Sequence, residues 1–188
     1  MSIKTFLGLT AMGALCLSCQ SNSYQIDGFA RHCHDGDTIC MAEEPMQKGT
    51  VTITLVENGK FAFIGETEDT ILCRIFPKKA PDLGVSFFLE PSSITVELSP
   101  LPEGNRVSGT RINNQWQQLN DSISLLGKEA VNTVMLMARD STAHLSRMKA
   151  IDSLHRRMSD CIHNTARRNS DNVLGRYIRQ NYKAPEFR

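Results

Sequence analysis

The sequence predicts an α+β protein in which an antiparallel β-sandwich of about seven or eight strands precedes an α-helical hairpin and a short third helix. Short alternating runs separated by turn residues fill the chain from Tyr24 to about Gly109, and apolar residues recur at helical spacing after Thr110. Short strands of this kind are typical of sandwiches and open barrels, whereas apolar steps of three and four mark one side of an amphipathic helix. We therefore expect a β-sandwich domain at residues 19–110 and a helical region at residues 111–188.

Turn residues separate the predicted strands. Asn58-Gly59 favours a hairpin between its flanking runs, because both central residues of a type I′ turn need positive φ. Asp35-Gly36-Asp37 predicts a second turn, since Asp and Gly are turn formers. In chain order the predicted strands are Tyr24–Cys33, Thr38–Ala42, Thr50–Val56, Phe61–Ile64, Ile71–Phe76, Val85–Leu89 and Ile94–Leu98.

Two apolar stripes predict two long helices. The first consists of Trp116, Leu119, Ile123, Leu126, Ala130, Val134 and Met137, and the second of Leu145, Met148, Ile151, Leu154, Met158 and Ile162. Asp140-Ser141-Thr142 between them supplies capping residues, which indicates a turn rather than one long rod. A third helix is expected to open near Ser170-Asp171 and to end before Ala184-Pro185. Each stripe must be buried against the other, against the sheet, or against a partner.

The first residues of the chain resemble the export signal of bacterial lipoproteins. One cation precedes an apolar run at 6–17 that is too short to span a bilayer, and Ser18 and Cys19 follow it. This order resembles a lipobox, although Cys16 stands where leucine is usual. The resemblance implies that residues 1–18 are a signal peptide and that the Cys19 thiol is lipidated.

A lipidated Cys19 implies a membrane-anchored protein of the cell envelope. Gln20–Ser23 are polar and uncharged, and they lack the acidic run associated with inner-membrane retention or surface display. We therefore expect attachment to the outer membrane, facing the periplasm.

Charge divides the chain into two halves. Residues 19–110 carry 7 basic and 13 acidic residues, whereas residues 111–188 carry 13 basic and 7 acidic residues. Net charges of −6 and +6 follow from these counts. A basic half is compatible with nucleic acid or anionic lipid. We expect a solvated helical surface and no nucleic-acid partner, because an exported and tethered protein seldom meets nucleic acid.

The segment from His32 to Cys40 holds the residues most suited to covalent or metal chemistry. Cys33 and Cys40 flank the predicted turn and are a candidate disulfide, which export permits; a shift of one residue in register would instead place their thiols on opposite faces. His32 and His34 point to one face of an extended strand and with Asp37 suggest a metal site, but no fourth ligand follows at a recognisable spacing. We assign no metal and no cofactor.

Short motifs resemble a known family: Tyr24, Ile26 and Gly28; Gly59–Gly65; Leu89–Val96; Val107–Thr110 with Asn113; and Asn169–Gly175. They resemble the lipoprotein domain of unknown function found N-terminal to thioredoxin-like domains in bacterial envelope proteins of the thiol:disulfide interchange and peroxiredoxin-like kinds. The resemblance covers essentially the whole of residues 19–188. In that family the redox chemistry belongs to a CxxC in the thioredoxin-like domain, and residues 19–188 contain no CxxC. No catalytic residue is therefore carried over.

These observations predict a membrane-anchored envelope lipoprotein with a non-catalytic binding or scaffolding role, in which the sheet surface or the helical stripe is the contact. No nucleophile elbow, P-loop or zinc-helix motif occurs in the sequence, so an enzyme is not expected. One alternative is an accessory subunit that provides recognition for a separate thioredoxin-like thiol:disulfide exchange protein. A second alternative is a metal-binding lipoprotein that uses His32 and His34.

Overall fold

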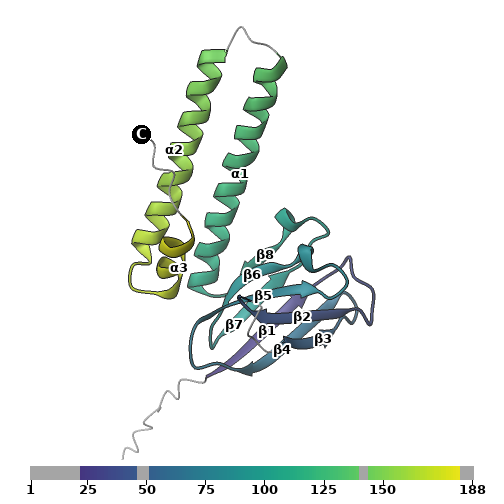
Figure 1. The fold of residues 1–188 in the computed structure, drawn as a ribbon. Helices are drawn as coiled ribbons and strands as arrows, with labels where there is room; N and C mark the ends of the chain where they lie inside the picture. The colour runs from purple at the N-terminus through teal and green to yellow at the C-terminus, as the bar shows by residue number, and fades with distance from the viewer. Residues whose placement is uncertain (1–21, 46–50, 140–143, 183–188) are drawn as a thin grey trace, which may run out of the picture.

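The chain folds into two packed β-sheets from which a helical hairpin projects (Figure 1). The computed structural model describes residues 22–45, 51–139 and 144–182. The strands are β1 (Ser23–Phe29), β2 (Thr38–Glu43), β3 (Val51–Leu55), β4 (Lys60–Glu66), β5 (Ile71–Pro77), β6 (Val85–Leu89), β7 (Ser93–Glu97) and β8 (Arg106–Ser108). The helices are α1 (Arg111–Arg139), α2 (His144–Arg168) and α3 (Val173–Asn181). The predicted α+β class, a sandwich followed by a hairpin and a short helix, is confirmed.

Each sheet of the sandwich has four strands, in the orders β4-β1-β7-β8 and β3-β2-β5-β6. Alternation along the strands places one set of side chains between the sheets. Ile26 of β1 lies opposite both Phe63 of β4 and Ile94 of β7, and all three are buried. One pair departs from the expected antiparallel pattern, because β1 and β7 run parallel.

The Asn58-Gly59 turn forms as predicted, but it does not join a hairpin. Both residues have positive φ, 52° and 70°, as a type I′ turn requires. The strands on either side then separate into different sheets, because β3 pairs with β2 and β4 pairs with β1. The turn is thus a corner of the sandwich, and the hairpin prediction is wrong in its strand pairing.

The second predicted turn is also a corner rather than a hairpin. The chain passes from β1 in one sheet to β2 in the other. The two corners bond to each other: the N–H of Gly36 donates to the carbonyl of Val56 at 2.9 Å, and the N–H of Ala30 donates to the carbonyl of Gly59 at 2.9 Å. Glu57 and Lys60, on either side of Asn58-Gly59, still exchange both backbone hydrogen bonds as in a hairpin. Beyond this pair, backbone groups of the two corners are satisfied by each other.

The helical region consists of an antiparallel pair, α1 and α2, with α3 at its foot (Figure 1). The predicted turn at Asp140-Ser141-Thr142 lies outside the described residues, between the end of α1 and the start of α2. The side chain of Asn172 caps α3 by accepting a hydrogen bond from the N–H of Gly175 at 3.2 Å. Among the described helices, none combines the length and the apolar character needed to cross a bilayer.

Two helical glycines provide a matched test of these helices. At Gly127 an added Cβ would meet nothing within 4 Å, whereas at Gly175 it would collide with the carbonyl of Asn169. We expect Gly127→Ala to stabilise the protein by up to about 1 kcal/mol, since alanine is the better helix former, and Gly175→Ala to destabilise it. Urea unfolding followed by circular dichroism measures both changes. A stability for Gly175→Ala equal to that of the wild type would contradict the close packing of α3 on Asn169.

Candidate functional site

The base of the hairpin is fixed to the edge of a sheet by Asn113. Its side chain is fully buried, its Oδ1 accepts from the N–H of Phe88 at 2.9 Å, and its Nδ2 donates to the carbonyl of Phe88 at 2.7 Å. Phe88 is on β6, at the end of its sheet, so the amide bonds both backbone groups of Phe88 as a neighbouring strand would. The hydroxyl of Thr110 accepts the second Nδ2 hydrogen at 3.0 Å. The start of α1 is thereby held in one place.

An aromatic cluster joins this sheet edge to the start of α1 and to α3. The ring of Trp116 on α1 contacts those of Phe88, Tyr177 and Tyr182 edge to face, with centroids 5.9, 5.6 and 6.3 Å apart. Such pairs contribute about 0.5–1.5 kcal/mol each beyond the area that they bury. The foot of α1, the sheet and α3 are consequently one packed unit.

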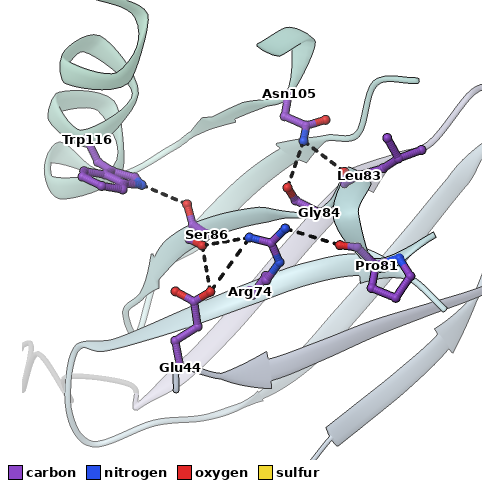
Figure 2. Close-up of polar contacts among 8 residues, drawn as sticks. All are labelled: Glu44, Arg74, Pro81, Leu83, Gly84, Ser86, Asn105 and Trp116. Carbon is purple, nitrogen blue, oxygen red and sulfur yellow. Dashed lines mark hydrogen bonds and ion pairs between the residues drawn. The ribbon is translucent and has the colours of Figure 1, made fainter. Parts of the chain in front are cut away.

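Polar contacts surround the same joint, by which we mean the contact of the foot of α1 and of α3 with the sheet edge at β6 (Figure 2). The indole N–H of Trp116 donates to the carbonyl of Ser86 at 2.9 Å, and the Ser86 hydroxyl donates to Oε1 of Glu44 at 3.0 Å. Nη2 of Arg74 donates to the carbonyl of Pro81 at 3.3 Å, and its Nη1 lies 4.0 Å from Glu44. Ser86 and Glu44 are of two residue types found in catalytic triads. The third side chain here is Arg74, which cannot act as the base because it does not accept a proton. We assign this group a structural role.

The two helical stripes are buried only over the part of the hairpin nearest the sandwich. On α1 burial ends at Leu126, which is 4% exposed, and on α2 it begins at Leu154, which is 3% exposed. Beyond these positions apolar side chains on both helices face solvent in the part of the chain that the structure describes. Those that share one side of the pair, and that we name the distal apolar face, are Val131 (54% exposed), Val134 (52%), Met135 (56%), Leu145 (70%) and Met148 (46%).

Helical spacing shows that this face is continuous. Val131, Val134 and Met135 are three and four residues apart on α1, and Leu145 and Met148 are three apart on α2, so each set forms one stripe. In an antiparallel pair these two stripes fall on the same side of the seam. Leu125 and Leu136 are also exposed, but their spacing of eleven places them together on the other side of α1. An exposed patch of large apolar side chains is a mark of an interaction site.

Basic residues predominate in the distal half of the hairpin. Between residues 127 and 157, outside the undescribed 140–143, the sequence has six basic and two acidic residues. Arg157 lies 3.8 Å from Glu129, while Lys128, Lys149 and Arg156 are exposed. The distal half of the hairpin is therefore apolar and cationic.

The predicted site between His32 and Cys40 is only partly brought together. His32, Cys33 and Asp37 line a small cavity of about 130 Å³ with Lys79. Nζ of Lys79 donates to Asp37 at 2.6 Å and, with the backbone N–H of His34, lowers the pKa of that carboxyl. The His34 ring is 95% exposed, whereas both ring nitrogens of His32 are buried without a protein hydrogen-bond partner. The two histidines thus occupy different surroundings.

The described residues contain no group of three or more His, Cys, Asp or Glu side chains placed to hold a metal ion. Asp37, the third proposed ligand, is engaged by Lys79 and by the backbone of His34. The metal alternative therefore remains a prediction from the sequence pattern, with no assembled donor set to describe. Cys19, the predicted lipidation site, lies outside the described residues.

Cys33 and Cys40 are free thiols in the structure, as are Cys73 and Cys161. Cys33 packs against the core between the sheets, whereas Cys40 lies with Ala42 and Phe76 in a separate cluster. The arrangement corresponds to the alternative in which the two thiols lie on opposite faces. Burial, together with the charges of Glu43 and Glu44, raises the pKa of Cys73 to about 12, so this thiol is protonated at neutral pH.

The sequence indicated some of these functional residues and missed others. The stripes contained Val134, Leu145 and Met148, although not their exposure, which depends on how far the sandwich and α3 reach along the hairpin. The Asn113 amide pair was not predicted, because an asparagine near a helix start is ordinarily a cap or a solvated residue. The signals in the sequence were its position three residues after Thr110 and its place in the motif formed with Val107–Thr110.

Comparison with known proteins finds a similarity that covers the sandwich and the start of α1, but not the rest of the hairpin. Residues 24–116 match the family model described as "Domain of unknown function (DUF4369)". The matched segment runs from β1 to Trp116 and includes Asn113, a shorter stretch than the whole of 19–188 over which the sequence resemblance was expected. No curated protein and no solved structure matches the chain.

The buried amide of Asn113 should contribute strongly to the stability of the protein. We expect Asn113→Ala to destabilise the protein by about 1–3 kcal/mol, because it leaves the backbone groups of Phe88 buried without partners. Asn132→Ala, on the exposed surface of the same helix, is the matched control, for which a change within about 0.5 kcal/mol is expected. Urea unfolding monitored by Trp116 fluorescence provides the measurement. Equal stability of the two variants would contradict the role of the amide.

The thiols predict a pattern of alkylation. We expect Cys40 and Cys73, which are 4% and 3% exposed, to resist iodoacetamide in the native protein at pH 8 and to react in urea. Intact-mass analysis of protein extracted from cells without reductant should then count four thiols among Cys33, Cys40, Cys73 and Cys161. Two alkyl groups that are missing until a reductant is added would show the Cys33–Cys40 bridge instead.

Proposed function

We propose that the protein is a lipid-anchored lipoprotein of the cell envelope that binds a protein partner through the distal apolar face, in a non-catalytic binding or scaffolding role. The observation that carries the proposal is the set of apolar side chains on α1 and α2 that are 46–70% exposed beyond the reach of the sandwich. Leaving them in water is unfavourable by about 25 cal/mol for each Å². A partner that covers them removes this cost.

The anchor is the second part of the proposal. The apolar run at 6–17 followed by Ser18-Cys19 supports removal of residues 1–18 and lipidation of Cys19. A single acyl chain gives only reversible attachment, so stable anchoring would need more than one chain at this residue. Attachment to the outer membrane on its periplasmic side would leave the sandwich near the bilayer and the hairpin free to reach a partner.

A second candidate is an accessory role beside a separate thioredoxin-like protein. The motifs at Gly59–Gly65 and Leu89–Val96 support it, through their resemblance to the domain that precedes thioredoxin-like domains in envelope proteins. In this role the chain would supply recognition and the other protein the CxxC. Co-purification of a thioredoxin-like protein after crosslinking would favour this candidate over a general scaffold.

The anchor is tested by metabolic labelling with a clickable palmitate analogue. We expect the wild-type protein and Cys161→Ala to be labelled and to sediment with membranes, and Cys19→Ala to be unlabelled. Cys161→Ala controls for loss of a thiol elsewhere in the chain. An unlabelled wild-type protein would contradict lipidation and, with it, the proposed location.

The contact surface is tested by a photo-crosslinking residue placed in living cells at Val134 or at Ile64. Ile64 is 76% exposed on β4 and serves as the control for an exposed apolar position elsewhere. We expect a discrete adduct from Val134 that disappears when Met148→Glu is added, and none from Ile64. Equal adducts from both positions, or an adduct unaffected by Met148→Glu, would overturn the assignment of the distal apolar face.

A further inference from the structure

The distal apolar face continues a surface that α3 already occupies. On α2 the residues Met148, Ile151, Met158, Ile162 and Ala166 follow one another at helical spacing and so form one stripe. Ile162 and Ala166 are buried in the same cluster as Leu174 and Ile178 of α3. At the other end of the stripe Met148 is 46% exposed. One stripe is therefore covered by a helix near the sandwich and uncovered farther along.

The stripe on α1 behaves in the same way. Trp116 and Leu119 are buried in the cluster that contains α3, whereas Val134, on the same side of the helix, is 52% exposed. The side of the hairpin that carries both stripes has α3 at its foot (Figure 1). The apolar side that α3 covers near the sandwich is thus uncovered farther along both helices.

The apolar residues of α3 that pack on the hairpin indicate what kind of partner would fit the exposed part of the same stripes. Leu174 and Ile178, four residues apart, are 0% and 1% exposed, and Val173 and Tyr177 pack beside them. This is the spacing by which an amphipathic helix lies in an apolar groove. A second short helix placed beyond α3 would contact Val131, Val134 and Met148 through the same spacing of its own apolar residues.

The charged residues that border the distal apolar face indicate which kind of helix would bind there. Lys128 lies three residues before Val131, and Lys149 four residues after Leu145, so both border the distal apolar face; Asp152 and Arg156 continue the border on α2. The excess of basic residues favours an acidic partner. A second copy of the hairpin would set this cationic surface against itself, which disfavours pairing of two copies through this face.

Resting on the proposed function, we propose that the distal apolar face binds an amphipathic helix of a partner protein whose polar side is acidic, laid between α1 and α2 beyond the end of α3. Apolar contact with Val134, Met135 and Met148 gives the affinity. Lys128 and Lys149 give the preference for acidic sequences.

Two synthetic peptides of about 18 residues test the proposal, a length at which an isolated helix begins to be stable. They share one apolar stripe at i, i+3, i+4 and i+7 and differ only in a polar side of Glu or of Lys. We expect fluorescence anisotropy to show that the Glu peptide binds at least about tenfold more tightly than the Lys peptide, and that added salt reduces this difference. Equal binding, or tighter binding of the Lys peptide, would overturn the proposal.

Variants locate the binding. Met135→Glu and Met148→Glu are expected to abolish binding of the Glu peptide, while Ile64→Glu, on the sandwich, leaves it unchanged. Lys128→Glu with Lys149→Glu is expected to reverse the preference toward the Lys peptide. All of these positions are on the surface, and circular dichroism confirms that each variant is folded. Binding that survives both methionine variants would overturn the location.

Other occupants give distinct results. Co-sedimentation with vesicles containing anionic phosphatidylglycerol, lost in Met148→Glu while neither peptide binds, would show a membrane surface instead. Concentration-dependent dimerisation in sedimentation, lost in Met135→Glu, would show a second copy. Failure of the Glu peptide together with a Val134 adduct in cells would overturn only this inference, whereas absence of that adduct would overturn the proposed function itself.

Discussion

The bidentate contact between the Asn113 side chain and the backbone of Phe88 is the constraint on which the arrangement of the molecule depends. It occupies the open edge of β6 and at the same time fixes where α1 leaves the sandwich. Trp116 lies one turn farther along α1 and carries the aromatic cluster that holds α3. The sandwich and α3 cover only the foot of the hairpin, and the apolar side chains of its far half are exposed. The proposed contact surface lies in that uncovered half.

The same division separates the part of the chain that is similar to a described domain from the part that is not. The match at residues 24–116 includes the sheets, Asn113 and Trp116, which together make the joint. The distal apolar face is made by residues beyond it. The similarity to this domain therefore concerns the sandwich and the start of α1, whereas the proposed contact surface lies outside the matched residues.

Local patterns in the sequence predict most elements but not how they pair. The Asn58-Gly59 turn has the expected backbone conformation, yet its strands enter different sheets, because strand partners depend on contacts distant in sequence. β8 (Arg106–Ser108) was not predicted, since three residues are too few to show an alternation. The Glu44 contact with Ser86 joins residues 42 apart, and polar side chains give no sign of such partners until the fold assembles them.

The parallel pairing of β1 with β7 has a consequence for the order of folding. Ile26 lies opposite Ile94, so the first strand of the sandwich lacks one of its neighbours until most of the domain has emerged. Helical hairpins, by contrast, form from contacts close in sequence and form quickly. The sandwich can therefore close around its first strand only after its seventh strand is available.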